Sequence, residues 1–355
     1  MTAKVVETIS LDTQVFIATG FGFSGKSFQA LKKHLESGRL NLVMTDIAVR
    51  EVKSRIKQTV AAELINQRRY VNGAATLFNC SLPDVQTGLK KLDPDVITKD
   101  LCDQFDTFLK ETKATIIDVG DLSVGSVLDK YFAAEPPFGH SEEKKYEFPD
   151  AFAVQALAEW AEDRDVPMFV VSTDKLFQDA CGGCKHLVPK NTINEVLDHV
   201  ASDDKQLATF VRTETMKRIS QITAEAKADF EDRYYWVEDQ DGDAQVEVTN
   251  LQPADEPEII EISKEEATLQ LNIAATYKAD LSYDDSATAS YSEGTLVYVE
   301  HRNEEVEREQ ELTVEIEVMY EQMDPDSFEI ISVSLVSPSD GFGVDTGDAH
   351  DWPYK

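Results

Sequence analysis

The hydrophobic pattern of the chain changes its period near residue 240, and this change limits what the two parts can fold into. Over residues 1–200, short apolar runs alternate with long stretches of helical periodicity, a pattern typical of a parallel sheet flanked by helices. After residue 241, apolar and polar residues alternate one by one, as in QVEVTNL and ELTVEIEVMYE. This alternation indicates an antiparallel sheet with one face in water. We therefore expect an α/β fold followed by a β-rich domain.

Five apolar runs in the first part are predicted to be strands, and helices are predicted between them. The predicted strands are residues 7–11, 40–44, 114–119, 168–172 and 186–188. The predicted helices are residues 26–37, 46–79, 84–112, 123–133, 149–164 and 192–200. The predicted domains are an α/β domain (1–200), a helical linker (201–240), an acidic antiparallel β domain (241–337) and a loose C-terminal tail (338–355).

Charge is distributed unevenly between these parts. The whole chain carries a net charge of −33, but residues 1–200 hold 29 acidic and 23 basic residues, and residues 201–355 hold 38 and 11. The acidic surplus is therefore a property of the second part of the chain. In an organism whose proteins are all acidic, both parts would carry it. The first part is close enough to neutral to bind a phosphate backbone, although the total charge alone argues against nucleic-acid binding.

The start of the chain and its cysteines bear on location. MTAKVVETISLD lacks the features of a secretory signal, and no apolar run approaches the ~20 residues that a membrane helix needs. Four cysteines are too few for a disulfide framework in a chain of 355 residues. We expect a soluble, cytoplasmic protein that does not associate with membranes.

Four acidic residues are predicted to meet at one edge of the parallel sheet. Asp12 ends the first strand and Asp174 follows the fourth, while Glu51 and Asp150 lie near the start of helices. Open α/β sheets bind ligands at the carboxyl ends of their strands. Four carboxylates gathered there would repel one another by several kcal/mol, and a divalent cation would remove that repulsion. Because carboxylate oxygens suit hard cations, the sequence predicts a Mg²⁺ or Mn²⁺ site.

Four stretches of sequence surround these acids in a fixed order: ISLDTQVF, TDIAVREVKSRI, KKYEFPDAFAVQALAEWA and VVSTDKLF. In this order and spacing they resemble the motifs of the PIN-domain nucleases, and most closely those of a bacterial PIN-like subgroup. The resemblance covers about residues 7–200. It implies a metal-dependent endoribonuclease whose catalytic and metal-binding residues are Asp12, Glu51, Asp150 and Asp174. It also implies that Thr13 and Thr173 help to orient these acids.

A site of this kind hydrolyses phosphodiester bonds with water and needs no protein nucleophile. One or two metal ions bind the scissile phosphate, lower the pKa of a coordinated water and stabilise the departing oxygen. The expected substrate is RNA. Basic residues close to the acids in sequence are candidates for binding it: Lys26, Arg50, Lys53, Arg55, Lys144, Lys145 and Lys175.

The acidic second domain suggests regulation of such a nuclease. Its negative surface would keep RNA off the enzyme until a partner displaces it, as in a regulated toxin or a phage-defence effector, or it would dock a basic protein partner or regulator. A homo-oligomer is compatible with this interpretation.

Residues 20–27, GFGFSGKS, match the phosphate-binding pattern G-x-x-x-x-G-K-[ST] and keep a P-loop NTPase open as an alternative function. Phe21 and Phe23 would crowd such a loop, however, and the PIN-like subgroup carries an aromatic-rich loop at this place. The sequence favours a chance match, with Lys26 as a basic residue that faces the substrate. A catalytically idle PIN-like scaffold for RNA or protein is a third alternative, which the presence of all four acids disfavours.

Two smaller motifs have structural interpretations that we prefer. Cys181, Cys184 and His186 offer three zinc ligands within one short stretch, but a fourth would have to come from Cys80 or Cys102 far away in the sequence. The aromatic run at residues 234–236 is predicted to pack between the two parts of the chain rather than to stack on bases.

Overall fold

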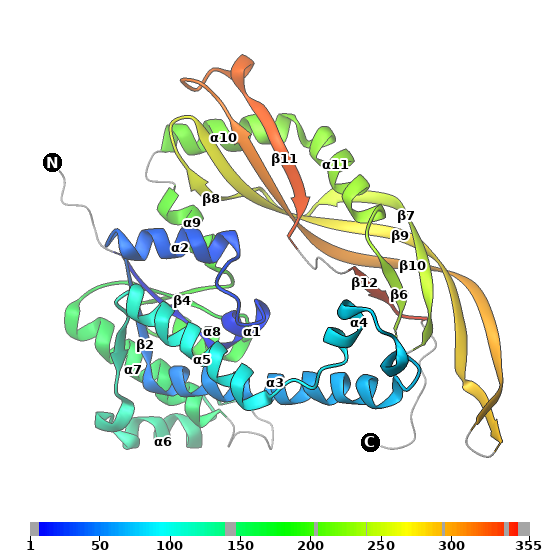
Figure 1. The fold of residues 1–355 in the computed structure, drawn as a ribbon. Helices are drawn as coiled ribbons and strands as arrows, with labels where there is room; N and C mark the ends of the chain where they lie inside the picture. The colour runs from blue at the N-terminus through cyan, green and yellow to red at the C-terminus, as the bar shows by residue number, and fades with distance from the viewer. Residues whose placement is uncertain are drawn as a thin grey trace. The chain divides into compact units, whose positions relative to one another are not determined.

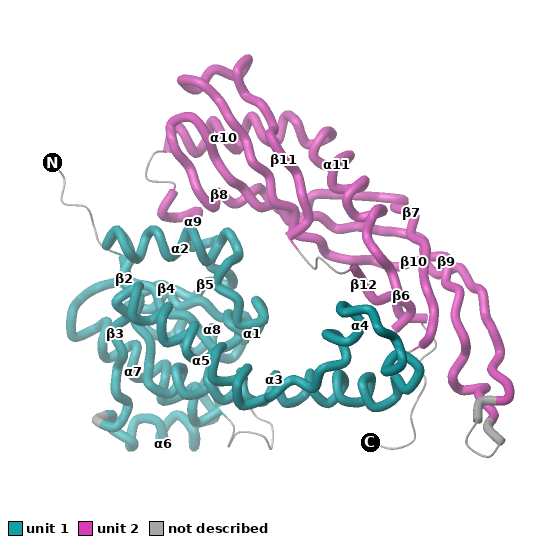
Figure 2. The backbone as a smooth tube through the Cα atoms, in the orientation of Figure 1, with its two compact units in different colours: residues 1–196 teal, residues 197–355 magenta. Residues whose placement is uncertain are grey.

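The computed structural model describes residues 7–138, 147–201, 205–238, 240–292, 295–336 and 341–346. The chain divides into two compact units, residues 1–196 and residues 197–355 (Figure 2). No helix within the described ranges is long and apolar enough to cross a membrane.

The first unit is built on a five-stranded parallel sheet with the strand order β3-β2-β1-β4-β5 (Figure 1). The strands are β1 (Glu7–Leu11), β2 (Leu40–Thr45), β3 (Thr115–Ile117), β4 (Met168–Val171) and β5 (Leu187–Lys190). Each coincides with a predicted strand, so the predicted α/β class is confirmed. The strand order reverses between β1 and β4, which creates a topological switch point at the carboxyl ends of these two strands.

Helices connect the strands of the first unit. They are α1 (Thr13–Ala18), α2 (Lys26–Glu36), α3 (Asp46–Gly73), α4 (Pro83–Gly88), α5 (Pro94–Glu111), α6 (Val124–Ala133), α7 (Phe148–Arg164) and α8 (Lys175–Gly182), with short 3-10 helices η1 (Leu77–Asn79) and η2 (Val119–Asp121). After β5, α9 (Ile193–Ala201) crosses the boundary between the two units. The helix predicted over residues 84–112 is two helices. Asp93 caps α5 and Pro94 occupies its first turn, where proline suits a new helix rather than the interior of an old one.

Two apolar layers hold the first unit together. On one side, α7 and α8 pack against the sheet through a buried cluster that includes Leu157, Met168 and Phe177. A second cluster consists of rings from α1, α2, α5 and the loop between α1 and α2, whose centroids lie 4.9–6.4 Å apart: Phe16, Phe23, Phe28, Phe105 and Phe108. Contacts of this kind fix the helices that follow β1 and β2.

The second unit is a seven-stranded sheet with the order β11-β10-β9-β7-β6-β12, in which β8 pairs with β9. Its strands are β6 (Tyr235–Val237), β7 (Asp241–Pro253), β8 (Glu258–Ile262), β9 (Glu266–Ser292), β10 (Thr295–Met319), β11 (Glu329–Leu335) and β12 (Phe342–Val344). All pairs are antiparallel except β6 with β12, so the predicted antiparallel sheet is confirmed with one parallel pair at its edge. Along β10, buried Leu312, Val314, Ile316 and Val318 alternate with more exposed glutamates, as the sequence pattern predicts.

Two helices cover one face of this sheet. They are α10 (Lys205–Lys217) and α11 (Ile219–Glu231), and their Val211, Ile222 and Phe230 share one buried cluster with the strands. Residues 201–240, which the sequence suggests as a linker, therefore carry part of the core of this unit. Residues 342–344 form β12, although the sequence places them in a loose tail.

Candidate active site

Asp12 and Asp174 follow β1 and β4 at the switch point of the parallel sheet. The backbone N–H of Asp12 donates to the carbonyl of Val171 at 2.9 Å, which joins the two strand ends. Ser172 is fully buried; its hydroxyl donates to Asp12 Oδ2 at 2.7 Å and accepts from the backbone N–H of Asp174 at 3.0 Å. The backbone N–H of Thr13 donates to Asp12 Oδ1 at 2.6 Å. Both oxygens of Asp12 are thus held in place.

Each of these two aspartates also starts a short helix. Asp12 is the N-cap of α1, and Asp174 is the N-cap of α8, where its Oδ1 accepts from the backbone N–H of Phe177 at 2.8 Å. N-capping satisfies the first free N–H groups of a helix and is favoured by the positive end of the helix dipole. The strand–Asp–helix arrangement therefore explains why acids occupy these two positions.

Glu51 approaches the same edge from α3. Its Oε2 accepts a hydrogen bond from the hydroxyl of buried Thr13 at 3.1 Å. The other acids of α3 lie elsewhere: Asp46 accepts from the backbone N–H of Val119 at 3.2 Å and pairs with Arg50 at 2.5 Å, and Glu63 is exposed. Of the three acids on this helix, Glu51 is the one that is hydrogen-bonded to the residue next to Asp12.

Asp150 lies in the first turn of α7 and carries the most perturbed carboxyl of the group. Burial, followed by the charges of Asp12 and Glu51, raises its pKa to about 8. The charges of Glu147 and Asp174 act in the same direction. Four elements of the first unit therefore bring carboxylates close enough together to disfavour one another's ionisation.

The pKa values of Asp12 and Glu51 are raised as well. Burial is the main cause for both, and hydrogen bonds from Ser172 to Asp12 and from Thr13 to Glu51 act in the opposite direction. Within the described ranges, none of the four acids forms an ion pair with a lysine or arginine side chain. The arrangement is a negative site without an ion-paired base, although the charge of Arg55 lowers the pKa of Glu51 somewhat. Perturbed pKa values of this kind cluster at functional sites.

The donor chemistry of this site fits a hard divalent cation. The carboxylates of Asp12, Glu51 and Asp150 are partly buried, which is the main reason that their pKa values are raised, and their negative charges also repel one another. A cation bound to their oxygens would remove this repulsion. In the part of the chain that the structure describes, no three His, Cys, Asp or Glu side chains stand close enough together to form a finished metal cage.

Ser172 is the residue of this site that the sequence analysis missed. The family resemblance implies Thr173 as the orienting residue in VVSTD, but Thr173 is exposed, and the hydroxyl that hydrogen-bonds Asp12 is that of Ser172. The available signal was the position of Ser172: it directly follows an apolar strand, two residues before a capping aspartate, where a buried hydroxyl needs a polar partner.

The candidate substrate-binding lysines differ in their surroundings. Lys26 is the exposed first residue of α2. Lys53 pairs with Asp106 of α5 at 2.7 Å, so part of its charge is already compensated. Lys144 and Lys145 lie outside the described residues.

Residues 20–27 do not have the surroundings of a phosphate loop. Such a loop joins a strand to a helix, but here the preceding element is α1, and the strand β1 already ends at Leu11. Phe21 is buried, and the ring of Phe23 stacks on Phe108 with centroids 4.9 Å apart. The glycine-rich segment is anchored by its aromatic residues in the core, as the aromatic-loop interpretation expects.

The cysteine motif and the aromatic run each place a residue in a hydrophobic core, which favours a structural role for both. Cys181 is fully buried in the cluster between α7 and α8, where burial raises the pKa of its thiol. Tyr235 lies in the core of the second unit and donates its hydroxyl to the carbonyl of Phe230 at 2.6 Å. Its neighbour Tyr234 is exposed and donates to Asp243 at 2.7 Å.

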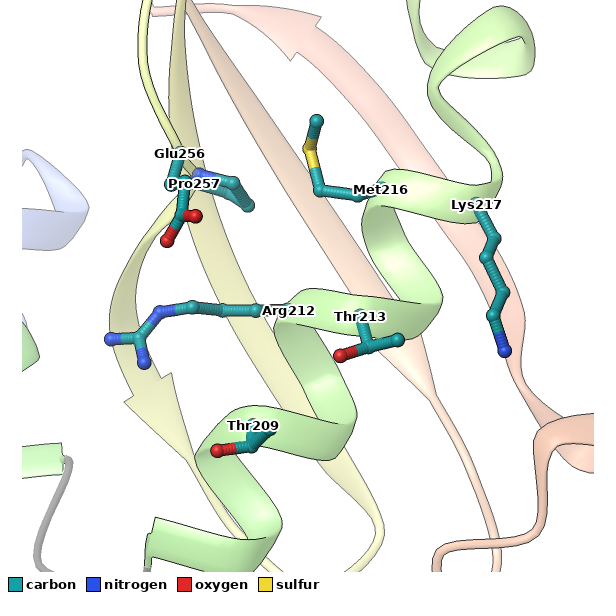
Figure 3. A pocket seen from close by; sticks show the side chains of 7 residues that line it. All are labelled: Thr209, Arg212, Thr213, Met216, Lys217, Glu256 and Pro257. Atoms are coloured by element: carbon teal, nitrogen blue, oxygen red, sulfur yellow. The ribbon is translucent and has the colours of Figure 1, made fainter.

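A hollow in the second unit is no rival as a catalytic site. It lies between α10 and the segment that leads into β8, with Arg212 reaching toward Glu256 and Pro257 (Figure 3). Arg212 also pairs with Asp198, and Lys217 pairs with Glu214 at 2.6 Å. Among the described residues that line it, Glu256 is the one acid, so the hollow lacks the several carboxylates that would hold a metal ion for hydrolysis.

Comparison with known proteins addresses the first unit. The model of the PIN domain family matches residues 9–177, a range that contains all four acids and β1 to β4. No curated protein matches the chain, and no solved structure does. PIN domains are generally nucleases and typically use divalent metal ions. With its parallel sheet and its match to the family model, the first unit of this chain belongs to the PIN-domain family.

Proposed function

We propose that the chain is a metal-dependent endoribonuclease whose active site consists of Asp12, Glu51, Asp150 and Asp174. What supports the proposal is a set of contacts: Thr13 hydrogen-bonds both Asp12 and Glu51, and Ser172 hydrogen-bonds both Asp12 and the backbone of Asp174. The charges of Asp12, Glu51 and Asp174 all raise the pKa of Asp150. They gather at the switch point of a parallel sheet, where folds of this class bind ligands.

The chain's own residues divide the work of such a site. Ser172 and the backbone of Thr13 fix the orientation of Asp12, and the hydroxyl of Thr13 fixes Glu51. Asp150 holds its proton at neutral pH without a cation and is ready to release it when positive charge arrives. Mg²⁺ or Mn²⁺, when bound, would polarise the scissile phosphate and activate the attacking water. No side chain here needs to act as a nucleophile.

RNA is the substrate that we assign, because PIN domains are nucleases and the first unit is nearly neutral overall. Lys26, Lys53, Lys144 and Lys145 remain proposed contacts to its backbone, and Thr173 remains a proposed orienting residue. The acidic second unit suggests a regulated enzyme, such as a toxin or a phage-defence effector, in which a basic protein partner acts through that unit.

The experiment is a matched pair of substitutions on α3. Glu51→Gln is expected to abolish Mn²⁺-dependent cleavage of single-stranded RNA, whereas Glu63→Gln, an exposed acid on the same helix, is expected to leave it unchanged. Equal activity of both variants would refute the assignment of Glu51. A Lys26→Ala variant that loses ATP or GTP binding would instead restore the P-loop alternative, and RNA binding without cleavage in the unsubstituted protein would show an idle scaffold.

A further inference from the structure

The C-terminal half of α3 extends away from the sheet that carries the acids (Figure 1). Together with η1 and α4 it forms an arm, which we define as residues 64–92. Leu64, Val71 and Leu89 of the arm are buried, and the side-chain amide of Gln67 donates to the carbonyl of Lys90 at 2.9 Å. The arm is therefore a packed element with a definite surface.

The sign of its charge sets this region apart from the rest of the chain. The arm, residues 64–92, contains four basic residues and one acidic residue, and residues 53–63, which lead into it along α3, add three basic residues and one acidic residue, in a protein whose net charge is −33. A concentration of positive charge on one extended element is the electrostatic footprint of nucleic-acid binding. The basic residues are Lys53, Arg55, Lys57, Arg68, Arg69, Lys90 and Lys91.

A hollow of about 540 Å³ lies on the arm where α3 ends. It is lined by Asn66, Arg69, Tyr70, Gly73, Ala74 and Leu77. Tyr70 is 59% exposed. Within the described residues, the side chains of Asn66, Arg69 and Tyr70 make no hydrogen bond or ion pair.

The chemistry of this lining suits a nucleobase. An aromatic ring and a guanidinium plane are the groups on which unpaired bases stack, and an amide side chain can hydrogen-bond the edge of a base. Gly73 leaves open space above the backbone, because a Cβ atom placed there would meet no other atom within 4 Å. The hollow therefore offers a surface on which a base can stack, a polar group that can contact the edge of the base, and enough space for it.

The periodicity of α3 relates this hollow to the acidic site. Arg69 follows Glu51 by eighteen residues, which is five complete turns, so the two side chains leave α3 on the same face. At 1.5 Å per residue they are about 27 Å apart along the axis. Arg55, one turn after Glu51, lies on the same face and acts on the charge of Glu51.

We propose that this hollow binds a base of single-stranded RNA several nucleotides away from the bond that is cut. Tyr70 and Arg69 stack on the base, Asn66 contacts its edge, and Arg55 contacts the phosphate backbone between the hollow and the acids. This inference rests on the proposed function for the identity of the substrate, but the binding itself requires neither the metal ion nor cleavage.

A protein partner is the competing occupant, because Ile65, Leu77 and Leu82 are also exposed on the arm. The hollow itself favours RNA. Polar groups with unused hydrogen-bonding capacity surround its one aromatic ring, and the basic residues along α3 and after α4 give this region a positive charge that complements a phosphate backbone.

The test measures binding of a fluorescein-labelled oligoadenylate RNA to the full chain by fluorescence anisotropy, in EDTA so that no cleavage occurs. Tyr70→Ala is expected to weaken binding about five- to a hundredfold, and Tyr70→Phe to retain it, because stacking needs the ring rather than the hydroxyl. Arg69→Ala is expected to weaken binding more than Arg68→Ala, which removes the same charge from an exposed position outside the hollow.

Gly73→Leu supplies an independent variant. It fills the hollow without removing charge and improves helix propensity, so weaker RNA binding by a folded Gly73→Leu protein would support the proposal.

Three other outcomes would contradict the proposal or separate it from the proposed function. Equal losses of RNA affinity from Arg68→Ala and Arg69→Ala, with no effect of Tyr70→Ala, would show that the arm is a nonspecific positive surface and would overturn the proposal. Conversion of a dimer to a monomer by Tyr70→Ala, with RNA affinity unchanged, would assign the hollow to a second copy of the chain. If the unsubstituted protein binds RNA through the hollow but never cleaves it with Mn²⁺, the proposed function fails and the binding site stands.

Discussion

Both units of this protein are rich in carboxylates, yet the two groups behave differently. In the first unit, Asp12, Glu51 and Asp150 are partly buried, and their pKa values are raised. In the second unit, Glu305, Glu307, Glu309 and Glu311 extend from β10 on its exposed face, where water screens them. The number of acids in a unit is therefore a poor guide to function. Burial of the carboxylates, which raises their pKa values, is a better one.

The largest expected difference between the two groups is in catalysis. Asp12→Asn keeps the shape of the side chain but removes its charge, and we expect the rate of RNA cleavage to fall by about 10²–10³-fold. Asp280→Asn, at an exposed position of β9, is expected to leave the rate within about twofold. Single-turnover cleavage at saturating Mn²⁺ provides the measurement. Similar rates for both variants would erase the distinction between the two groups.

The next effect concerns the hydroxyl groups that hold the acids. Ser172→Ala removes the hydroxyl that donates to Oδ2 of Asp12, and we expect Mn²⁺ affinity or activity to fall about 10–100-fold. Ser332 is the matched control, since its hydroxyl donates to Glu317 of the second unit at 2.8 Å. Ser332→Ala should change neither quantity. Titration of activity against Mn²⁺ separates weaker metal binding from slower chemistry, and a Ser172→Ala enzyme with an unaltered Mn²⁺ profile and rate would contradict the positioning role.

A third effect appears in the stability of the metal-free protein. The folded-state pKa of Asp150, about 8, lies above its unfolded value near 3.8, so the folded protein holds this proton more tightly. The associated stability is complete below the unfolded pKa and is lost as the pH rises through 8. We expect the free energy of unfolding in EDTA to fall by on the order of 1–3 kcal/mol between pH 6 and pH 9 from this group, since partial exposure and relaxation limit the effect.

Urea denaturation at the two pH values measures this difference. Asp150→Asn has no such proton to lose and should show a smaller fall with pH, while Glu307→Gln should follow the unsubstituted protein. Added Mn²⁺ should reverse the loss at high pH, because a cation bound only by the folded state stabilises it. A pH profile that is the same for Asp150→Asn and the unsubstituted protein would show that the acids of the first unit are not coupled in the way that we describe.

Regular patterns allowed much of this structure to be predicted from the sequence. The five parallel strands follow from apolar runs, and the acids at their ends follow from the rule that ligands bind at the carboxyl edge. Helices α1 and α8 were missed, because six and eight residues are too few to show helical periodicity. Their capping residues, Asp12 and Asp174, are also the predicted metal ligands, so N-capping and metal binding both explain an acid at these two positions.

Tertiary contacts limited the prediction elsewhere. Aspartate is uncommon within strands, yet β9 continues through Asp284 and Asp285, and buried Asp285 pairs with Arg302 of β10 at 2.8 Å. The role of Ser172 depends in the same way on Asp12, which is distant in the sequence. Only the pairing of β1 with β4 brings those two residues together.

The smallest expected effect lies on the exposed face of the second unit. Lys278 is a base surrounded by acids there, and it pairs with Glu305 at 2.7 Å while Glu247 and Glu307 lie nearby. Lys278→Ala removes an exposed ion pair and leaves like charges facing one another across three strands, so we expect a small decrease in the melting temperature, within roughly 2 °C. The decrease should vanish in high salt, because exposed charges are screened within a few ångströms at that ionic strength. Differential scanning calorimetry at low and high salt tests this. A large loss that salt does not relieve would mean that this face is covered rather than open to water, and the contrast between buried and solvated acids would then need another explanation.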